Sequence, residues 1–195
     1  MFPPEVKVAG PSERQSVLNT LTLAFTEDPP MRWFFPHADE FLTYFTQFAM
    51  GMGGRAFDHG TAFYLADYSA AALWLPPNVT SDTEALLEIF AALAWPPAKA
   101  ADLGGIAEQV GAYHPHDPHW YLAFIGADAA YQGKGLGSIL MKHALALCDR
   151  DQLPAYLESS TPKNVPFYER FGFEAIGRVQ AGSSPVITPM LRAPR

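Results

Sequence analysis

The chain has 195 residues, of which 49% are hydrophobic and 17% charged, so we expect one globular domain, residues 1–195, with a substantial core. A net charge of −7 at pH 7 and a pI near 5.3 argue against a nucleic-acid partner. Residues 1–5 show no basic region before an apolar run, and no apolar run approaches the ~18 residues of a membrane span. The one cysteine, Cys148, fits a reducing compartment. We therefore expect a cytoplasmic protein without a secretory signal or membrane association.

The first third of the chain predicts a strand, two helices and an aromatic loop. An edge strand is expected over residues 5–9, and a helix capped by Ser12 follows. Residues 31–36 are read as a loop between prolines, in which Trp33 and Phe34 either line a substrate pocket or pack in the core. An apolar stripe over residues 41–52 then predicts a helix.

The middle of the chain predicts a hairpin followed by two helices. Residues 61–66 and 70–75 alternate as a strand pair with a turn at residues 67–69. A helix is expected to begin at Ser81 or Asp82, and a second to cover residues 99–113. This helical pair either covers a substrate site or pads the sheet.

Residues 114–119, His-Pro-His-Asp-Pro-His, bring three histidines within six residues. Such a cluster can bind a metal ion. Two prolines stiffen the segment and no cysteine or glutamate cluster lies nearby, so a solvated loop is the favoured interpretation and no metal is expected.

A buried strand over residues 121–127 leads into a glycine-rich loop at residues 133–138 and then into a helix. Glycines let main-chain N–H groups approach a ligand closely, and a helix N-terminus favours negative charge. The pattern predicts a site for a phosphate-bearing ligand. The loop does not have the spacing of a Walker motif, Gly-x4-Gly-Lys-Ser/Thr. Its glycines are also shifted by one residue from the dinucleotide-binding motif Gly-x-Gly-x-x-Gly. Glu158, however, lies where the ribose-binding acid of that motif would be expected. A dinucleotide-binding oxidoreductase is thus a minor alternative.

The spacing Gln132-x-x-Gly135-x-Gly137 resembles the Gln/Arg-x-x-Gly-x-Gly/Ala signature of the GNAT superfamily of N-acetyltransferases. Residues 164–173 resemble a second motif of that family, with Asn164 at its start and Tyr168 at its tyrosine. The amino-acid sequence of residues 157–160 and 164–170 is most similar to the puromycin N-acetyltransferase-like branch of that family.

The resemblance implies an α+β fold: a mixed, mostly antiparallel sheet of about seven strands, flanked by helices and splayed between the fourth and fifth strands. Acetyl-CoA would lie in that gap as co-substrate. The strand amides would hold the pantetheine, a bulge would form at Gly126, and the glycine loop would bind the pyrophosphate. The implied cofactor-binding residues are Ile125, Gly126, Ala127, Gln132, Gly133, Lys134, Gly135, Leu136, Gly137, Ser138, Asn164 and Phe167.

The resemblance also implies direct attack of a neutral amine on the thioester, with Tyr168 protonating the leaving thiolate. The position where relatives often carry a base is Tyr121, a poor base at neutral pH. Glu158 and His119 are therefore the first candidates for the base, followed by Glu27 and Asp28, and a water relay is also possible. Asp28, Trp33, Phe34 and Tyr121 are the candidate substrate-binding residues.

Two classes of function are compatible with these residues. The favoured one is an acetyl-CoA-dependent N-acetyltransferase acting on a primary amine of a small molecule, with a peptide or protein N-terminus as a further acceptor to consider. The other is a non-catalytic acyl-CoA-binding or sensor module. Because the chain keeps Gln132, Gly135, Gly137, Asn164 and Tyr168, the enzyme is favoured. Both a monomer and a homodimer are compatible with the sequence.

Overall fold

A computed structural model describes residues 4–195. Seven strands form one sheet in the order β1-β2-β3-β4-β5-β7-β6, and only the β4–β5 pair is parallel. This is the mixed, mostly antiparallel sheet that the sequence predicts. The strands are β1 (Val6–Val8), β2 (Ala62–Leu65), β3 (Ala70–Leu75), β4 (Trp120–Ala127), β5 (Ala155–Ser159), β6 (Glu174–Ala175) and β7 (Thr188–Arg192).

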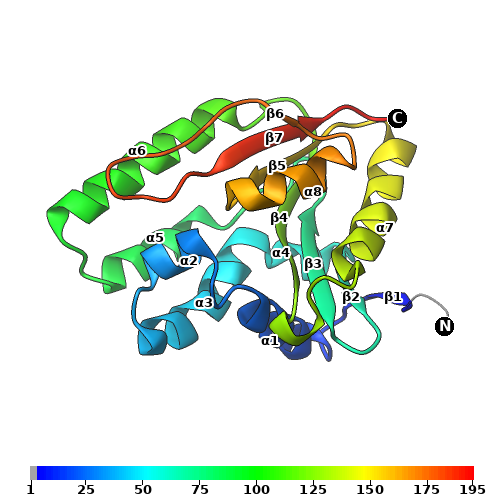
Figure 1. Ribbon diagram of the computed structural model, residues 1–195, viewed down its shortest axis with the longest axis horizontal. Coiled ribbons are helices and arrows are strands. Elements are labelled where there is room, and N and C mark those ends of the chain that lie inside the picture. Colours follow the sequence, from blue (N-terminus) through cyan, green and yellow to red (C-terminus); the bar gives the residue numbers. More distant parts are fainter. Residues whose placement is uncertain (1–3) are drawn as a thin grey trace.

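Helices cover both faces of the sheet (Figure 1). The α-helices are α1 (Arg14–Ala24), α2 (Pro29–Phe34), α3 (Ala38–Gly53), α4 (Arg55–Asp58), α5 (Thr83–Ala92), α6 (Pro97–Tyr113), α7 (Leu136–Asp151) and α8 (Val165–Glu169). Two 3₁₀ turns, η1 (Ala129–Tyr131) and η2 (Pro162–Asn164), precede α7 and α8. No helix of residues 4–195 is both long and apolar enough to cross a membrane.

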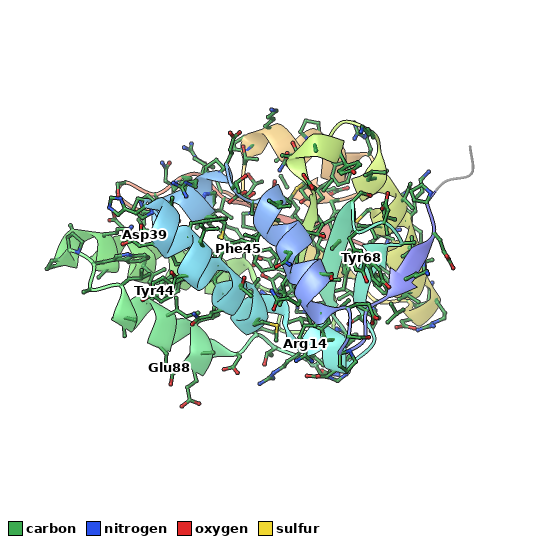
Figure 2. The ribbon with its side chains drawn as sticks, turned by 90° about the horizontal axis from the view of Figure 1, so that it is seen from below. Arg14, Asp39, Tyr44, Phe45, Tyr68 and Glu88 are labelled. Carbon is green, nitrogen blue, oxygen red and sulfur yellow. The ribbon has the colours of Figure 1, made fainter. Side chains whose placement is uncertain are left out.

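Side chains that alternate along β3 contribute to two hydrophobic cores, one on each face of the sheet. Leu73 and Leu75 face α1 and α3, whereas Trp74 faces α7 and α8. All three side chains are buried, as expected for a central strand that is covered on both faces. Figure 2 shows Phe45 between α1 and α3, where its ring stacks on Phe25 at a centroid distance of 5.8 Å.

The predicted elements differ from the structure in four places. Residues 29–34 form α2 instead of a loop, because Asp28 accepts a hydrogen bond from the Met31 N–H and proline is tolerated in a first helical turn. Ser12 does not cap α1, since its hydroxyl donates to the Glu13 carboxylate. Asn164 is a residue type that caps helices, but its side chain makes no capping bond to α8. The pattern of residues 173–179 predicts a strand, of which only the two-residue β6 forms, because the following chain leaves the sheet to contact α6.

Candidate active site

The site lies where β4 and β5 diverge. The two strands pair only from Trp120–Ala155 to Leu122–Leu157, so the rest of β4 has no β5 neighbour. A cavity of about 240 Å³ opens beside this divergence. Its polar lining comes from five residues: Asp28, Tyr121, Glu158, Ser160 and Tyr168. The predicted catalytic residues thus meet at one cavity.

Asp28 lies at the start of α2 and faces this cavity. Its Oδ2 accepts a hydrogen bond of 2.5 Å from the Ser160 hydroxyl, and its Oδ1 accepts one from the Met31 N–H. Burial raises the pKa of the Asp28 carboxyl above its usual value, while these two hydrogen bonds act in the opposite direction. Both carboxyl oxygens are therefore already engaged in the fold.

Glu158, on β5, has one oxygen engaged and one without a hydrogen-bond partner. Its Oε2 accepts a hydrogen bond of 2.7 Å from the Tyr121 hydroxyl on the neighbouring strand. Its Oε1 is buried, has no hydrogen-bond partner among residues 4–195, and lies 3.6 Å from Nδ1 of His114. Burial, and then the charge of Glu158, raise the pKa of Tyr121 well above its usual value, so Tyr121 serves as a donor and not as a base.

The hydrogen bonds of His119 indicate which of its two ring nitrogens carries the proton. Nδ1 of His119 lies 2.8 Å from the carbonyl oxygen of Asp117, which can only accept, so we infer that this nitrogen carries the ring proton. Burial lowers the pKa of His119, which favours the neutral ring, and its Nε2 then accepts from Nε2 of His114 at 3.1 Å. The remaining nitrogen of His114, Nδ1, faces Oε1 of Glu158 at 3.6 Å.

The proximity of His114 to Glu158 does not follow from the sequence, which indicates a solvated loop over residues 114–119 and offers His119 as a candidate base. Three histidines within six residues indicated a possible site. Which side chains their rings would contact depends on how the end of α6 packs beside β5. No group of three or more His, Cys, Asp or Glu side chains within residues 4–195 is placed to hold a metal ion.

Tyr168, on α8, lies across the cavity from the start of α2. Its side chain is buried, and its ring packs on Phe167 and Phe173. Burial, and then the charge of Asp28, raise the pKa of Tyr168, so its hydroxyl is protonated at neutral pH and can donate a hydrogen bond.

The glycine loop leads directly into α7. Gly133 and Gly135 have φ values of +75° and +78°, and a Cβ at either position would meet no heavy atom within 4 Å. The loop is therefore both left-handed and open, which suits close approach by an anionic ligand. Gln132 holds it against β4 through a 3.3 Å bond from Nε2 to the Ala127 carbonyl.

The bulge in β4 lies three residues before the position that the family resemblance implies. Leu73 pairs with Phe124 and Trp74 with Leu122, so the extra residue is Ala123 and not Gly126. Gly126 is instead a contact point with α1, since a Cβ there would lie 2.6 Å from the Ala24 Cβ. Its missing side chain lets the helix approach the strand.

The other predicted residues divide into two groups. Phe34 and Ile125 line the cavity, whereas Trp33 does not: its indole donates to the Ser183 hydroxyl at 3.2 Å and packs against Trp95. The Phe167 ring lies 3.4 Å from a Cβ built on Gly137, so α8 approaches the start of α7. Four further predicted residues do not line the cavity: Lys134, Leu136, Ser138 and Asn164.

Residues 72–173, just over half of the chain, match the acetyltransferase (GNAT) family. The matched region runs from β3 to the end of α8 and includes the β4–β5 divergence, the glycine loop and Tyr168. The chain therefore belongs to the GNAT family.

Two curated proteins match parts of the chain. An uncharacterised N-acetyltransferase of Schizosaccharomyces pombe is 46% identical over 57 residues, which are 29% of this chain and 23% of that protein. N-alpha-acetyltransferase 50 of Danio rerio is 27% identical over 85 residues, 38% of this chain and 51% of that protein. The chain thus spans about a quarter and about half of these relatives, respectively.

Solved structures of the same fold cover nearly the whole chain. An acetyltransferase from Corynebacterium glutamicum, described as histone acetyltransferase HPA2 and related acetyltransferase, superposes with a TM-score of 0.74 at 22% identity over 100% of this chain and 98% of that one. Arylalkylamine N-acetyltransferase 2 of Aedes aegypti has a TM-score of 0.64 at 13% identity over 100% of both chains. The polyamine N-acetyltransferase of Drosophila melanogaster has a TM-score of 0.65 at 15% identity, covering 98% of this chain and 100% of that one. At these identities the likeness establishes the fold.

Proposed function

We propose that this chain transfers an acetyl group from acetyl-CoA to a primary amine of a small molecule. One observation carries the proposal: Glu158, Asp28 and Tyr168 converge on a single cavity at the β4–β5 divergence, next to an open glycine loop. The buried Oε1 of Glu158, which has no hydrogen-bond partner among residues 4–195, supports a catalytic role for this carboxylate.

The residues around the glycine loop fit acetyl-CoA. The open positions at Gly133 and Gly135 leave room for a pyrophosphate against the N-terminus of the 16-residue helix α7. Beyond Leu122, β4 lacks a β5 neighbour, so main-chain groups near Ile125 and Ala127 would receive the pantetheine as an added strand. Bound acetyl-CoA would supply the acetyl group activated as a thioester.

Glu158 is the proposed base because its Oε1 is unengaged, while both oxygens of Asp28 are hydrogen-bonded. As the nitrogen–carbon bond forms and the carbon–sulfur bond breaks, the Glu158 carboxylate takes the excess proton of the amine through one water, because Oε1 itself is covered by protein. His114, at 3.6 Å, then takes up the same proton and passes it toward His119 and solvent. The Asp28 carboxylate stabilises the amine in the cavity.

Tyr168 is proposed to hydrogen-bond the leaving sulfur. A thiol has a pKa near 8.5, whereas the pKa of Tyr168 is raised above its ordinary value of about 10. Complete proton transfer from the tyrosine would therefore be uphill, so its hydroxyl stabilises the thiolate by donation, and the thiolate takes its proton from water. This refines the sequence-based expectation of a full general acid.

The resemblance to the puromycin N-acetyltransferase-like branch supports one acceptor to test within this class. Puromycin presents a primary amine close to an aromatic ring, and this end of the molecule alone would enter the cavity, against the aromatic wall formed by Phe34, Phe48 and Phe90.

The test combines calorimetric titration with acetyl-CoA and a thiol-release assay with amines. Burial raises the pKa of Cys148, the one cysteine of the chain, to about 12, so the enzyme itself adds little signal to a thiol reagent. Gly135→Asp places a negative charge in the loop and should abolish binding. Gly104→Asp is the matched control, because Gly104 lies on α6 and a Cβ there meets nothing within 4 Å. A folded wild type that binds no acetyl-CoA would overturn the proposal.

A further inference from the structure

We infer that the acceptor is a monoamine, with a single positive charge and a compact apolar body such as one aromatic ring on a short chain. This inference rests on the proposed function and assigns the substrate class of the same cavity. The structure supports it through three independent features of the cavity: the placement of charge, the source of the apolar wall, and the volume.

Charge occurs at one end of the cavity only. Of the described residues that line it, Asp28 and Glu158 alone are charged, and both lie with Tyr121, Ser160 and Tyr168 near the divergence of β4 and β5. One ammonium group would thus meet two carboxylates. A second ammonium on the same molecule would have to find another partner deeper in the cavity.

The remainder of the wall offers no such partner. It is built by the inner faces of α3, α5 and α6 together with α2, and its side chains are aliphatic or aromatic. The acidic residues of α5 lie elsewhere: Figure 2 shows Glu88 pointing outward from the helix. These wall residues are Phe34, Phe48, Leu86, Phe90, Leu103 and Ile106.

Behind the aromatic wall lies a cation. Nζ of Lys99 donates to the Phe34 carbonyl oxygen at 3.4 Å and lies 4.1 Å from the centroid of the Trp95 ring. The Trp95 ring in turn stacks on Phe34 with a centroid distance of 6.1 Å. A second ammonium placed against Phe34 would be unpaired and would face a like charge, so polyamines are disfavoured for two separate reasons.

The volume of about 240 Å³ limits the part of the acceptor that lies inside the cavity. An apolar cavity of about 150 Å³ takes a benzene molecule, so this cavity has room for one ring and a short amine-bearing chain. Phe34, Phe48 and Phe90 pack on one another with centroid distances of 5.4–6.0 Å and so form one aromatic surface, on which a ring of the acceptor can make edge or offset contacts.

The first experiment compares phenethylamine with putrescine and spermidine in the thiol-release assay. We expect kcat/KM for phenethylamine to exceed that for either polyamine by at least about 100-fold, because the polyamine must bury an unpaired charge. Equal or better turnover of putrescine would overturn the inference.

The second experiment tries to change the preference. Leu103 lies on α6 about two turns before Val110, on the side of the cavity away from His114. Leu103→Glu should raise the kcat/KM ratio of putrescine to phenethylamine by at least tenfold, by providing the missing partner. Leu103→Gln keeps the size without the charge, and Gly104→Glu places the same charge outside the cavity, so neither should change the ratio. An equal change in the Leu103→Gln variant would overturn the charge argument.

Acetyl-CoA calorimetry separates this inference from the proposed function. A protein that binds acetyl-CoA but neither binds nor acetylates phenethylamine would refute the substrate class alone. A protein that binds no acetyl-CoA would refute the proposed function itself. If Leu103→Glu does not fold, the wild-type comparison still decides the inference.

Discussion

The neighbours of Tyr168 separate its structural role from its chemical one. Its ring packs between Phe167 and Phe173, and its hydroxyl faces the cavity. Tyr168→Phe keeps the ring, so the melting temperature should change little. The loss of the hydrogen bond to the leaving sulfur should lower kcat by about 10²–10³-fold, with KM for acetyl-CoA nearly unchanged. Steady-state kinetics beside a thermal melt would check this, and unchanged kcat would remove Tyr168 from the reaction.

The raised pKa of Tyr168 also predicts part of the pH dependence. Because burial and the Asp28 charge hold this pKa above 10, the hydroxyl stays protonated through the neutral and mildly alkaline range. A pH profile of kcat in the wild type should therefore show no loss of rate attributable to Tyr168 below about pH 10. An alkaline limb below that value which disappears in Tyr168→Phe would contradict the assignment.

His114 can be tested by chemical rescue. In the proposed reaction its ring receives the proton from Glu158. Its side chain is 36% exposed, so a small base from solution can reach the same place. We expect His114→Asn to lower kcat by about tenfold and added imidazole to restore part of the rate. His116→Asn is the matched control, since His116 is an exposed residue of the same loop. A purely structural His114 would show no rescue.

Among single residues, local patterns were enough to select Tyr168, from its motif, and Glu158, as an acid at the end of a buried strand. Both line the cavity, and their chemical roles stay predictions. The partnership of Glu158 with His114 joins residues 44 positions apart and depends on how α6 enters β4, which no local pattern encodes. Trp33 was a reasonable candidate for the cavity, but its bond to Ser183 draws it toward a segment 150 residues away.

At the scale of elements, the helical pair α5–α6 is a wall of the active site. The segment between β6 and β7 holds α6 in place: the Asp102 carboxylate accepts from the Ser183 N–H and hydroxyl, and Gln109 bonds to Gln180. Figure 1 shows this segment running along α6. The sequence predicted both helices but left their role open between covering the site and padding the sheet, because burial on one face looks alike in either case.

This placement predicts that filling the cavity from α6 blocks the acceptor and spares the co-substrate. Ala107 lines the cavity and is itself exposed, so a larger side chain can enter without overpacking the core. Ala107→Phe should raise the KM for the amine by at least tenfold while the affinity for acetyl-CoA stays the same. Ala101→Phe, on an exposed part of the same helix outside the cavity, should do neither. Equal effects in both variants would indicate a general disturbance of α6.

Across the whole molecule, Arg192 ties three distant segments together. It is only 4% exposed, its two terminal nitrogens donate to the Asp149 carboxylate at 2.8 and 2.9 Å, and its Nε donates to the Phe171 carbonyl. These contacts join β7 to the end of α7 and to the chain after α8. Local sequence patterns predicted individual strands and helices. The contacts of Arg192 with Asp149 and Phe171 could not be predicted in this way, because they join segments that only the folded chain brings together.

Asp149 therefore links stability to pH. The hydrogen bonds from Arg192 hold the pKa of Asp149 below its usual value, so the folded state favours the ionised form. The resulting stabilisation is fully present above the unfolded pKa of about 3.9 and is lost as the pH falls through the lower folded value. Asp149→Asn should lower the free energy of unfolding by about 2 kcal/mol at pH 7, as expected for hydrogen bonds to a charged group.

The difference between Asp149→Asn and the wild type should shrink as the pH falls below about 4, because the wild-type carboxyl then becomes protonated and loses the same interaction. Urea unfolding at pH 7 and at pH 3 would measure both values. Asp151→Asn is the matched control: Asp151 pairs with the exposed Arg150, and such surface pairs contribute roughly 0–1 kcal/mol. A constant difference at both pH values would mean that the substitution acts through packing, and that the charge of Asp149 does not hold the C-terminal strand to α7.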